Sequence, residues 1–547
     1  MAKNLTFSNE ARSSVLSGVE KLSKAVSATM GPMGKNVILE KFVGAPSITK
    51  DGVSVAREIE LSNPIENLGC SLVKEVAGRT ADIAGDGTTT ATVLTHEIFK
   101  RGSDLIDSGY SPLMFRDAVN WTLKSLLNNL DKISREVETF DDLKNIASIS
   151  ANNDHFLGQK IAEAFDKAGK DGTVLAEASP GLETTVRMVD GVELKSGYTT
   201  PAFLESGATS ISLENCRVLI LDRDMTQINN CINLFNEISE KNIPILIIAN
   251  SIEKEALSTF VANAKAGRLK IATINTPKLG LEQAAWLEDL SILMGTKVFG
   301  GSSGISLSSA EVEDLGFAKK VVVGKYSTTI AGGRKSAARL EEKLAIYEED
   351  LSVLLGDAER RDLASRISFL KSKAAVLSVG YSTEAELRQK GDRIEDALAA
   401  TRAAIEEGVV PGAGMALVRA SNMVNTSKAK KGWEPAISVI LSACLRPFKQ
   451  ILENAHLDPE NILSQIKNLG INENGYDVAN GRFCNLLEAG VIDPKKVTRT
   501  ALENAISISL LLINTEVVVS QEPENPSGWQ PPPTYREADP SKLNHKH

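Results

Sequence analysis

The middle of the chain alternates between short apolar runs and longer helical patterns, and this alternation constrains the fold more than any other feature. From about residue 189 the pattern reads, in order, Arg217–Leu221, 225–240, Ile243–Ala249, 253–266, Ile271–Ile274 and 281–294. Apolar runs of this length separated by helices are typical of βαβ units. We therefore predict an α/β segment with a buried parallel sheet, followed by a charged helical hairpin over residues 334–373.

Both ends of the chain have helical rather than alternating character. In residues 10–29 apolar side chains recur close to every 3.6 positions, and a second long helical pattern covers roughly Pro64–Asp82. Near the other end, helical patterns occupy roughly 393–408, 432–455 and 497–513. Because the two ends resemble each other and the middle differs, we predict one helical domain built from both termini and interrupted by an inserted α/β domain.

Length, charge and cysteine use exclude several classes of protein. A chain of 547 residues is expected to hold about three to four domains. With 70 acidic and 61 basic residues the net charge is −9, which argues against nucleic acid or an anionic membrane as the main partner. The five cysteines are scattered without a CxxC pair, and the five histidines are not at zinc-ligand spacing. The N-terminus has no apolar signal segment, and no apolar run approaches the roughly 18 residues of a membrane span, so we expect a cytosolic protein.

The strongest local motif is the hexamer Gly85-Asp86-Gly87-Thr88-Thr89-Thr90. Glycines let a backbone approach a ligand closely, and consecutive N–H groups at a helix start bind anions such as phosphate. Asp86 would supply one oxygen ligand for Mg²⁺, which keeps most of its waters. An Asp-Gly turn followed by a threonine N-cap explains the same hexamer equally well, so both interpretations stay open.

Two further turns carry residues that could act on phosphate. Thr29-Met30-Gly31-Pro32-Met33-Gly34 ends the first helical pattern, and Thr49-Lys50-Asp51-Gly52 places a lysine beside a carboxylate. The lysine could neutralise phosphate charge, and the carboxylate could hold a cation or position water. Taken alone, each is an ordinary turn. The chain has no Walker A sequence, and Gly412-Ala413-Gly414 lacks the third glycine of a dinucleotide fingerprint, so a nucleotide site here would be of neither common type.

Five motifs together resemble the bacterial group I chaperonins, the 60 kDa chaperonins of the GroEL type. They are ITKDGVSVAREIEL, GDGTTTATVL, ISANND, DALAATRAAIEEG and IDPKKVTR, and the resemblance runs from residue 3 to about 520. It implies an α+β multidomain chaperonin fold with an α-helical equatorial domain, a small intermediate domain and an α/β apical domain. The implied ranges are 1–132 and 407–520 (equatorial, ATP-binding), 133–189 and 375–406 (intermediate hinge), 190–374 (apical, client-binding) and 521–547 (a disordered, proline-rich tail).

The resemblance also implies an ATPase with ATP, Mg²⁺ and K⁺ as cofactors. By position, Asp396 orients the attacking water and Asp51 assists it, while Asp86 holds Mg²⁺. Asp493 would meet the ribose. The implied nucleotide-binding residues are Thr29, Met30, Gly31, Pro32, Lys50, Gly85, Asp86, Gly87, Thr88, Thr89, Thr90, Ala413, Asp477, Val478, Ala479 and Asp493, with Asp477, Val478 and Ala479 at the base.

In the inserted segment, the predicted helix 225–240 has an apolar arc of about 160°, and packing on a sheet accounts for about half of such residues. By position, residues of the family's client- and cochaperonin-binding surface are Phe203, Ile232, Phe235, Leu257, Val261 and Ala262. The implied partners are unfolded or partly folded proteins, a heptameric cochaperonin, and further copies of the chain in two stacked sevenfold rings. Neither nucleic acid nor a membrane is expected as a partner.

Several positions depart from the family pattern. Met33 replaces a usual basic residue, Ala202 a tyrosine, Ser196 an arginine and Ala413 the middle glycine of a triplet. Because of these departures, three functions stay open. They are an ATP-dependent folding chamber, a specialised paralogue that holds clients with weak ATP turnover, and a monomeric Mg-ATP transferase, for which the sequence offers no small-molecule pocket signature.

Overall fold

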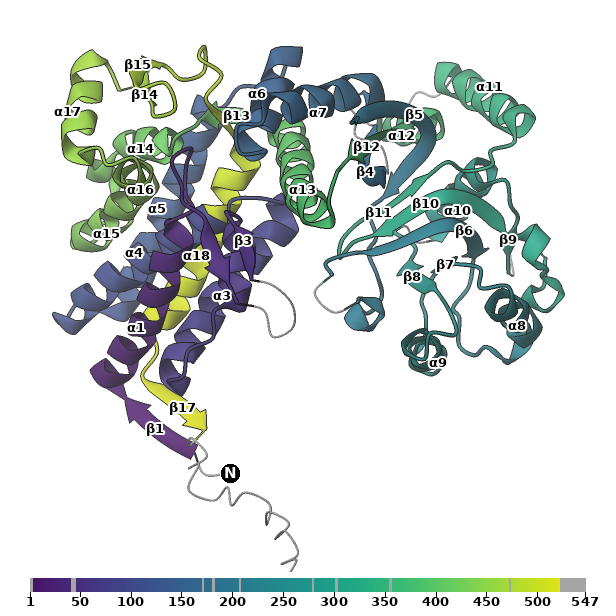
Figure 1. The fold of residues 1–547 in the computed structure, drawn as a ribbon, viewed down its shortest axis with the longest axis horizontal. Coiled ribbons are helices and arrows are strands. Elements are labelled where there is room, and N and C mark those ends of the chain that lie inside the picture. The colour runs from purple at the N-terminus through teal and green to yellow at the C-terminus, as the bar shows by residue number, and fades with distance from the viewer. Residues whose placement is uncertain are drawn as a thin grey trace, which may run out of the picture.

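The computed structural model describes residues 3–40, 46–169, 172–179, 183–205, 208–277, 280–300, 304–353, 357–471 and 474–521. A helical body lies at one end and a sheet with its helices at the other (Figure 1). Between them lie α6 (Phe140–Ser150), α7 (His155–Ala168) and α13 (Glu384–Glu407). All five cysteines fall in the described part and are free thiols. Among the described helices, none is both long and apolar enough to cross a membrane.

The helical body contains most of the long helices and four short strand pairs. Its helices are α1 (Ser8–Ser27), α2 (Gly52–Glu58), α3 (Pro64–Ala84), α4 (Thr88–Asp107), α5 (Pro112–Ile133), α14 (Met415–Asn422), α15 (Glu434–Cys444), α16 (Arg446–Asn454), α17 (Pro459–Leu469) and α18 (Lys495–Ile513), with the short 3₁₀ turn η5 (Thr426–Lys428). The strand pairs are β1 (Lys3–Phe7) with β17 (Val517–Gln521), β2 (Val37–Leu39) with β3 (Ser47–Thr49), β13 (Val409–Pro411) with β16 (Ile492–Pro494), and β14 (Asn474–Asp477) with β15 (Arg482–Asn485).

The two ends of the chain build this body together. β1 and β17 pair in antiparallel register, with Lys3 opposite Gln521. Helix α18 packs against α3 and α4, and α1 packs against the same two helices. Buried aliphatic and alanine side chains from both ends, such as Leu22, Leu94 and Ile506, form one core. Residues 522–547, most of the predicted tail, lie outside the described residues.

The other end of the molecule is built on a nine-stranded sheet. The strand order is β4-β12-β5-β11-β10-β6-β7-β8, with β9 paired to β6. The strands are β4 (Thr173–Ser179), β5 (Thr185–Leu194), β6 (Ile211–Leu221), β7 (Ile245–Ala249), β8 (Ile271–Asn275), β9 (Val298–Phe299), β10 (Gly316–Val323), β11 (Thr328–Ala331) and β12 (Lys373–Gly380). The accompanying helices are α8 (Ile232–Glu240), α9 (Lys254–Lys265), α10 (Gly280–Met294), α11 (Ala337–Val353) and α12 (Asp357–Lys371), with the short turns η1 (Pro201–Phe203), η2 (Asn229–Cys231), η3 (Leu307–Ser309) and η4 (Val312–Asp314).

The predicted parallel sheet is confirmed for β6, β7 and β8, which pair in parallel. The sheet as a whole is mixed, because β10 and β11, which were not predicted as strands from the sequence, pair antiparallel with each other. These two strands are joined by a tight turn in which the Gly324 N–H donates to the Ser327 carbonyl at 2.8 Å. So short a connection permits only antiparallel pairing, because a parallel crossover needs a dozen or more residues.

Two predicted helices differ from those observed. The pattern over 225–240 yields a regular helix only from Ile232. Met225 and Ile228 precede it and pack into the same core, so they extend the apolar pattern beyond the helix. The pattern over 432–455 is two helices, α15 and α16, with Leu445 between them. Pro447 lies in the first turn of α16, where proline begins a helix more readily than it continues one.

Contacts across the molecule tie the sheet to its neighbours. The predicted borders at 189/190 and 374/375 fall inside β5 and β12, so the sheet is continuous across both. An Arg402 guanidinium nitrogen on α13 lies 2.8 Å from a Glu193 carboxylate oxygen on β5. Lys325, at the turn between β10 and β11, forms an ion pair with Asp82 of α3. These ion pairs join the sheet to α13 and to the helical body.

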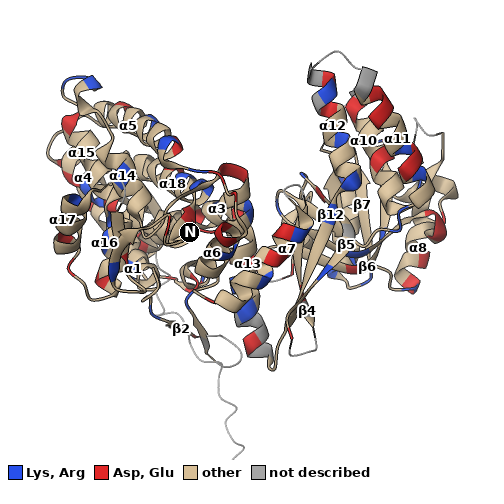
Figure 2. Ribbon diagram, turned by 90° about the horizontal axis from the view of Figure 1, so that it is seen from above, with Lys and Arg blue, Asp and Glu red and all other residues tan. Residues whose placement is uncertain are grey.

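Both acidic and basic residues occur along the ribbons of α11 and α12 (Figure 2). Beneath them, the fully buried Asp289 of α10 accepts a hydrogen bond from the Tyr347 hydroxyl at 2.8 Å and one from Arg366 Nε at 2.7 Å. A buried carboxylate needs such partners to offset its desolvation. The pair of bonds fastens α10 to both arms of the predicted helical hairpin.

Candidate functional site

A cleft with a volume of about 1670 Å³ opens between the helical body and α13. It brings together residues that are hundreds of positions apart in the sequence. The predicted site residues on its wall are Thr29, Met30, Gly31, Pro32, Lys50, Asp51, Asp86, Gly87, Thr88, Thr89, Thr90, Asp396, Ala413, Asp477, Val478, Ala479 and Asp493. Gly85 is the one predicted nucleotide-binding residue that does not line this cleft.

Gly85 lets the loop that carries Asp86 lie against α13. It ends α3 in the left-handed conformation, with φ of 74°. A Cβ atom added at Gly85 would lie 2.0 Å from the Cβ of Ala399. Ala399 is one helical turn beyond Asp396, so this contact sets Asp86 beside the helix that carries Asp396.

The N-terminus of α4 forms one wall of the cleft. Gly87, with φ of 86°, precedes the helix, and no side chain caps it. The helix therefore directs its first-turn N–H groups and the positive end of its dipole to the cleft side, where Thr88, Thr89 and Thr90 lie. A Cβ added at Gly52 would lie 2.2 Å from Thr89 Oγ1, so the turn carrying Asp51 lies directly against this helix start.

Asp51 is held in a fixed orientation by its own backbone. It is the N-cap of α2, and its two carboxylate oxygens accept from the N–H groups of Val53 at 3.1 Å and Ser54 at 2.8 Å. The Asp51 carboxylate therefore stays on the cleft wall without needing a partner from another element.

Several carboxylates lie in the cleft, and their negative charges raise one another's pKa values. Burial, followed by the charges of Asp86 and Asp51, raises the pKa of Asp396 well above its ordinary value. Burial also raises the pKa of Asp86, opposed by the Gly87 N–H, which donates to its carboxylate at 2.5 Å. A cation would relieve this repulsion. No three His, Cys, Asp or Glu side chains of the described chain are arranged to hold a metal by themselves. The donor set, one carboxylate beside an anion-binding helix start, fits Mg²⁺ that shares its coordination with phosphate and water.

Asp493 gives the cleft a testable pH dependence. Burial and, next, the charge of Asp86 raise the pKa of the Asp493 carboxyl to about 7. A carboxyl whose pKa rises on folding favours the folded state below its unfolded pKa of about 3.9, and this contribution is lost as the pH rises toward 7. We expect the free energy of unfolding of the ligand-free protein to fall less between about pH 5 and pH 8 in Asp493→Asn than in the wild type, measured by denaturant titration.

The control for this titration is Glu406→Gln. Glu406 pairs with Lys496 away from the cleft, so its variant should keep the wild-type pH slope. Equal slopes in Asp493→Asn and the wild type would contradict the raised pKa.

The model of the TCP-1/cpn60 chaperonin family matches residues 22–523. The chain belongs to this family. Among solved structures it is similar to the chaperonin gp146 from the bacteriophage EL 2 (Pseudomonas aeruginosa), crystallised in the presence of ATP-BeFx. At 22% identity the match covers 95% of this chain and 99% of that one, with a TM-score of 0.71 for crystal form II and 0.62 for form I. The predicted α+β multidomain chaperonin fold is confirmed.

On the far side of the chaperonin cleft, Asp477 is committed to a turn. Its carboxylate is buried and accepts from the Asn480 N–H at 3.2 Å and from Asn480 Nδ2 at 2.7 Å. Val478 lies beside it in a small apolar cluster that also contains Ile451 and Met30. This end of the cleft therefore presents mainly apolar side chains, and the Asp477 carboxylate already has hydrogen-bond donors within its own turn.

Ala413 departs from the family pattern at a strained position. Its φ is +54°, a left-handed conformation that costs a residue with a Cβ about 1–2 kcal/mol. Its neighbour Gly414, at φ of 74°, has no room for a side chain, because an added Cβ would lie 2.6 Å from the backbone nitrogen of Phe448.

These neighbours predict opposite effects of exchanging glycine and alanine. We expect Ala413→Gly to raise the free energy of unfolding by about 1 kcal/mol, because it removes left-handed strain. Gly414→Ala should lower it by more than that, because it adds strain and a backbone clash. Chemical denaturation of the ligand-free protein measures both, and a loss of stability in Ala413→Gly would refute this account.

The cleft also contains residues to which the sequence assigned no role. Among them are Ser150 at the end of α6, Asn152 and Asn153 just after it, and Asp392 and Glu395 on α13. The side chain of Ser150 hydrogen-bonds to Asp86. Asn152 and Asn153 both have positive φ, which asparagine tolerates better than most residues. Ser150, Asn152 and Asn153 all belong to the ISANND motif, which could have indicated their place in the site. Asp392 is four residues before Asp396 and therefore on the same helix face, which could have indicated the acidic residues of α13.

The predicted client-binding residues lie around α8 and α9, at the far end of the sheet (Figure 1). Ile232 on α8 is 51% exposed, whereas Phe235 is only 5% exposed. The Phe235 ring packs on Phe260 of α9 with 5.1 Å between ring centroids. Phe235 thus joins the two helices and does not reach the surface in this structure.

The other predicted client-binding residues are more accessible. Leu257 and Val261 are half-buried and Ala262 is exposed, all on α9. Phe203 in η1 is half-buried and packs against the cores on both faces of the sheet. Since η1 contacts α9, these residues belong to one region of the surface.

Proposed function

We propose that this chaperonin is an ATP-dependent molecular chaperone, in which nucleotide hydrolysis in the cleft drives the binding and release of non-native proteins. The observation that carries the proposal is that an uncapped helix start, Lys50 and the carboxylates of Asp51, Asp86 and Asp396 line one cleft. Phosphoryl transfer needs this combination of anion binding and charged groups in fixed positions. The phage chaperonin crystallised with ATP-BeFx supports a nucleotide as the ligand.

ATP would lie along the cleft with its phosphates at the start of α4. Lys50 and the N–H groups of the Gly87–Thr90 turn would bind the phosphate oxygens, and Asp86 would hold Mg²⁺, with K⁺ as a further ion. The ribose would lie at Asp493 and the base near Asp477, Val478 and Ala479. Ala413 would place its methyl group beside the nucleotide.

Asp396 would orient the attacking water, with Asp51 assisting. Its raised pKa reflects burial and, next, repulsion from Asp86 and Asp51, and bound cations would lower that pKa and favour the carboxylate as a hydrogen-bond acceptor for water. Because Asp396 is on α13, it acts on the phosphates only while α13 lies against the Gly85 loop.

Replacing Asp396 tests this role. We expect Asp396→Ala to lower the steady-state ATPase rate by about 100-fold or more, with ATP affinity within a few-fold of the wild type, because a water-positioning group contributes mainly in the transition state. Glu406→Ala, on the same helix but outside the cleft, should retain the wild-type rate. Full turnover in Asp396→Ala would overturn the assignment.

The same measurements separate the alternative functions. A wild-type protein that binds ATP with negligible hydrolysis would favour the specialised holdase. A wild-type protein that binds no ATP would overturn the proposed function.

Clients would bind the exposed apolar side chains of α8 and α9, with Phe203 at the edge. An apolar surface of this kind selects for exposed hydrophobic segments and not for a particular sequence. Phe235 supports the surface from below because its ring packs on Phe260. The same surface would receive a heptameric cochaperonin.

Ile232 is the most informative position for testing client binding. We expect Ile232→Ser to reduce severalfold the suppression of aggregation of a chemically denatured test protein, with unchanged thermal stability, because the side chain is half exposed. Asn236→Ser, at an exposed polar position on the same helix, is the control. Phe235→Ala should instead lower stability by about 3–5 kcal/mol, because it empties a core position. Undiminished suppression by Ile232→Ser would count against this surface.

Further copies of the chain would bind through two apolar ribbons. Leu5 and Phe7 are exposed on the β1–β17 pair, and Ile38 and Ile48 on the β2–β3 pair. The ribbons are different surfaces of one chain, so contact between them is head-to-tail, and such a contact forms a ring when the rotation between neighbouring copies closes.

Light scattering tests this assembly. We expect a particle mass of about fourteen times the 58.7 kDa chain, as two sevenfold rings require. The double variant Ile38→Asp/Ile48→Asp should lower that mass, because it buries charge at the contact. A wild-type mass of one chain would exclude the ring.

A further inference from the structure

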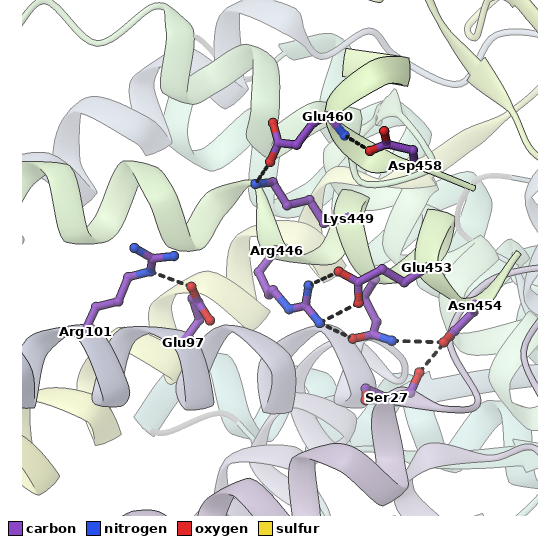
Figure 3. Close-up of polar contacts among 10 residues, drawn as sticks. Ser27, Glu97, Arg101, Arg446, Lys449, Glu453, Asn454, Asp458 and Glu460 are labelled. Atoms are coloured by element: carbon purple, nitrogen blue, oxygen red, sulfur yellow. Dashed lines mark hydrogen bonds and ion pairs between the residues drawn. The ribbon is translucent and has the colours of Figure 1, made fainter. Parts of the chain in front are cut away.

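Helix α16 packs against the Thr29–Pro32 turn. Asn454, its last residue, donates one Nδ2 hydrogen to the carbonyl of Ser27 at the end of α1, at 2.8 Å (Figure 3), and the other to the Met30 carbonyl in the turn, at 2.9 Å. The Ser27 carbonyl also accepts from the Met30 N–H at 3.1 Å, so the Asn454 amide is a second donor to it. A Cβ added at Gly31 would lie 3.0 Å from Ile451 Cγ2, so the turn also lies directly on α16.

Two residues on α16 determine which way the Asn454 amide points. Gln450 Nε2 donates to Asn454 Oδ1 at 2.9 Å, and Arg446 Nη2 donates to Gln450 Oε1 at 2.6 Å. The three side chains are four residues apart and lie along one face of the helix. We call Arg446, Gln450 and Asn454 the amide ladder.

The direction of the ladder follows from hydrogen-bonding capacity. A guanidinium group donates and never accepts, so Gln450 must turn its oxygen to Arg446 and its NH₂ to Asn454. Asn454 must then present its oxygen to Gln450 and its NH₂ to the carbonyls of the turn. Glu453 fixes Arg446 in turn, because its carboxylate oxygens accept from Nη1 at 2.6 Å and from Nη2 at 2.8 Å (Figure 3).

We propose that Asn454, oriented by Gln450 and Arg446, is a positioning residue for the nucleotide, acting through the Thr29–Pro32 turn. Every residue of that turn lines the cleft, as Ile451 does, whereas Asn454 does not. Asn454 thus binds the carbonyl oxygens of Ser27 and Met30, and the opposite side of the turn faces the cleft. This inference rests on the proposed nucleotide site and adds to it a residue that does not contact the ligand.

The test uses the full-length protein with ATP and Mg²⁺. We expect Asn454→Ala to raise the dissociation constant and the KM for ATP about tenfold while kcat changes less than twofold, because two hydrogen bonds that hold the turn for binding are lost. Asn454→Asp should raise both at least as much, because a carboxylate cannot donate to the two carbonyls. Arg446→Met should raise both about threefold, because the ladder then loses its fixed direction.

Lys449→Ala is the matched control. Lys449 is on the same helix and pairs with Glu460, away from the ladder (Figure 3). Its variant should keep the wild-type dissociation constant within twofold. Thermal unfolding of each variant gives the folded fraction at the assay temperature.

The outcomes distinguish the inference from the function on which it rests. If the wild type binds no ATP, the proposed function fails and the inference fails with it. If the wild type binds ATP and Asn454→Ala binds equally well, the inference alone is overturned. A lower kcat at unchanged KM, in proportion to the folded fraction, would give Asn454 a purely structural role and would also overturn the inference.

Discussion

The carboxylates of Asp86 and Asp396 repel each other, and the contact between Gly85 and Ala399 keeps them close. The raised pKa of Asp396 and the need of the cleft for cations both depend in part on this proximity. Like charges in a partly buried site hold protons or attract cations. The carboxylates of the ligand-free cleft therefore repel one another without enough positive charge to balance them. Cations that bind together with a polyphosphate would provide the missing charge balance. An alanine at position 85 would separate α13 from the loop and remove this repulsion.

The chain order explains how such a cleft can exist. Residues before about 130 supply the helix start and the turns, and residues beyond about 380 supply Asp396, Ala413 and Asp493. The strand pair β13–β16 places Val410 opposite Asp493, so the Ala413 turn and Asp493 emerge at the same place. The inserted sheet separates these segments in sequence without separating them in space.

Local sequence predicted the parts of the fold that depend on local chemistry. The glycines at 85 and 87 and the helix that follows were predictable because backbone conformation requires them. The burial of Phe235 was not, because a single apolar arc does not reveal that Phe260 on another helix will pack against it. Asn454 escaped notice because its partners are more than 420 positions away. The strand β10 was not predicted, and its antiparallel pairing with β6 depends on residues about 100 positions apart. The role of Asp396 came from resemblance and not from its position on a charged helix.

Helix α13 carries Asp396 near its middle and Arg402 less than two turns later, where the guanidinium binds Glu193 of β5. Helix α13 is one unbroken helix of 24 residues, about 36 Å long, so the ion pair and the Asp396 carboxylate belong to the same element. A displacement of the sheet that keeps this ion pair would therefore displace Asp396 as well, and a movement of Asp396 out of the cleft would displace the sheet. Under the proposed function, the rate of ATP hydrolysis and the orientation of the client-binding surface would both depend on the position of α13. A client that resists displacement of that surface would then slow the hydrolysis that leads to its own release.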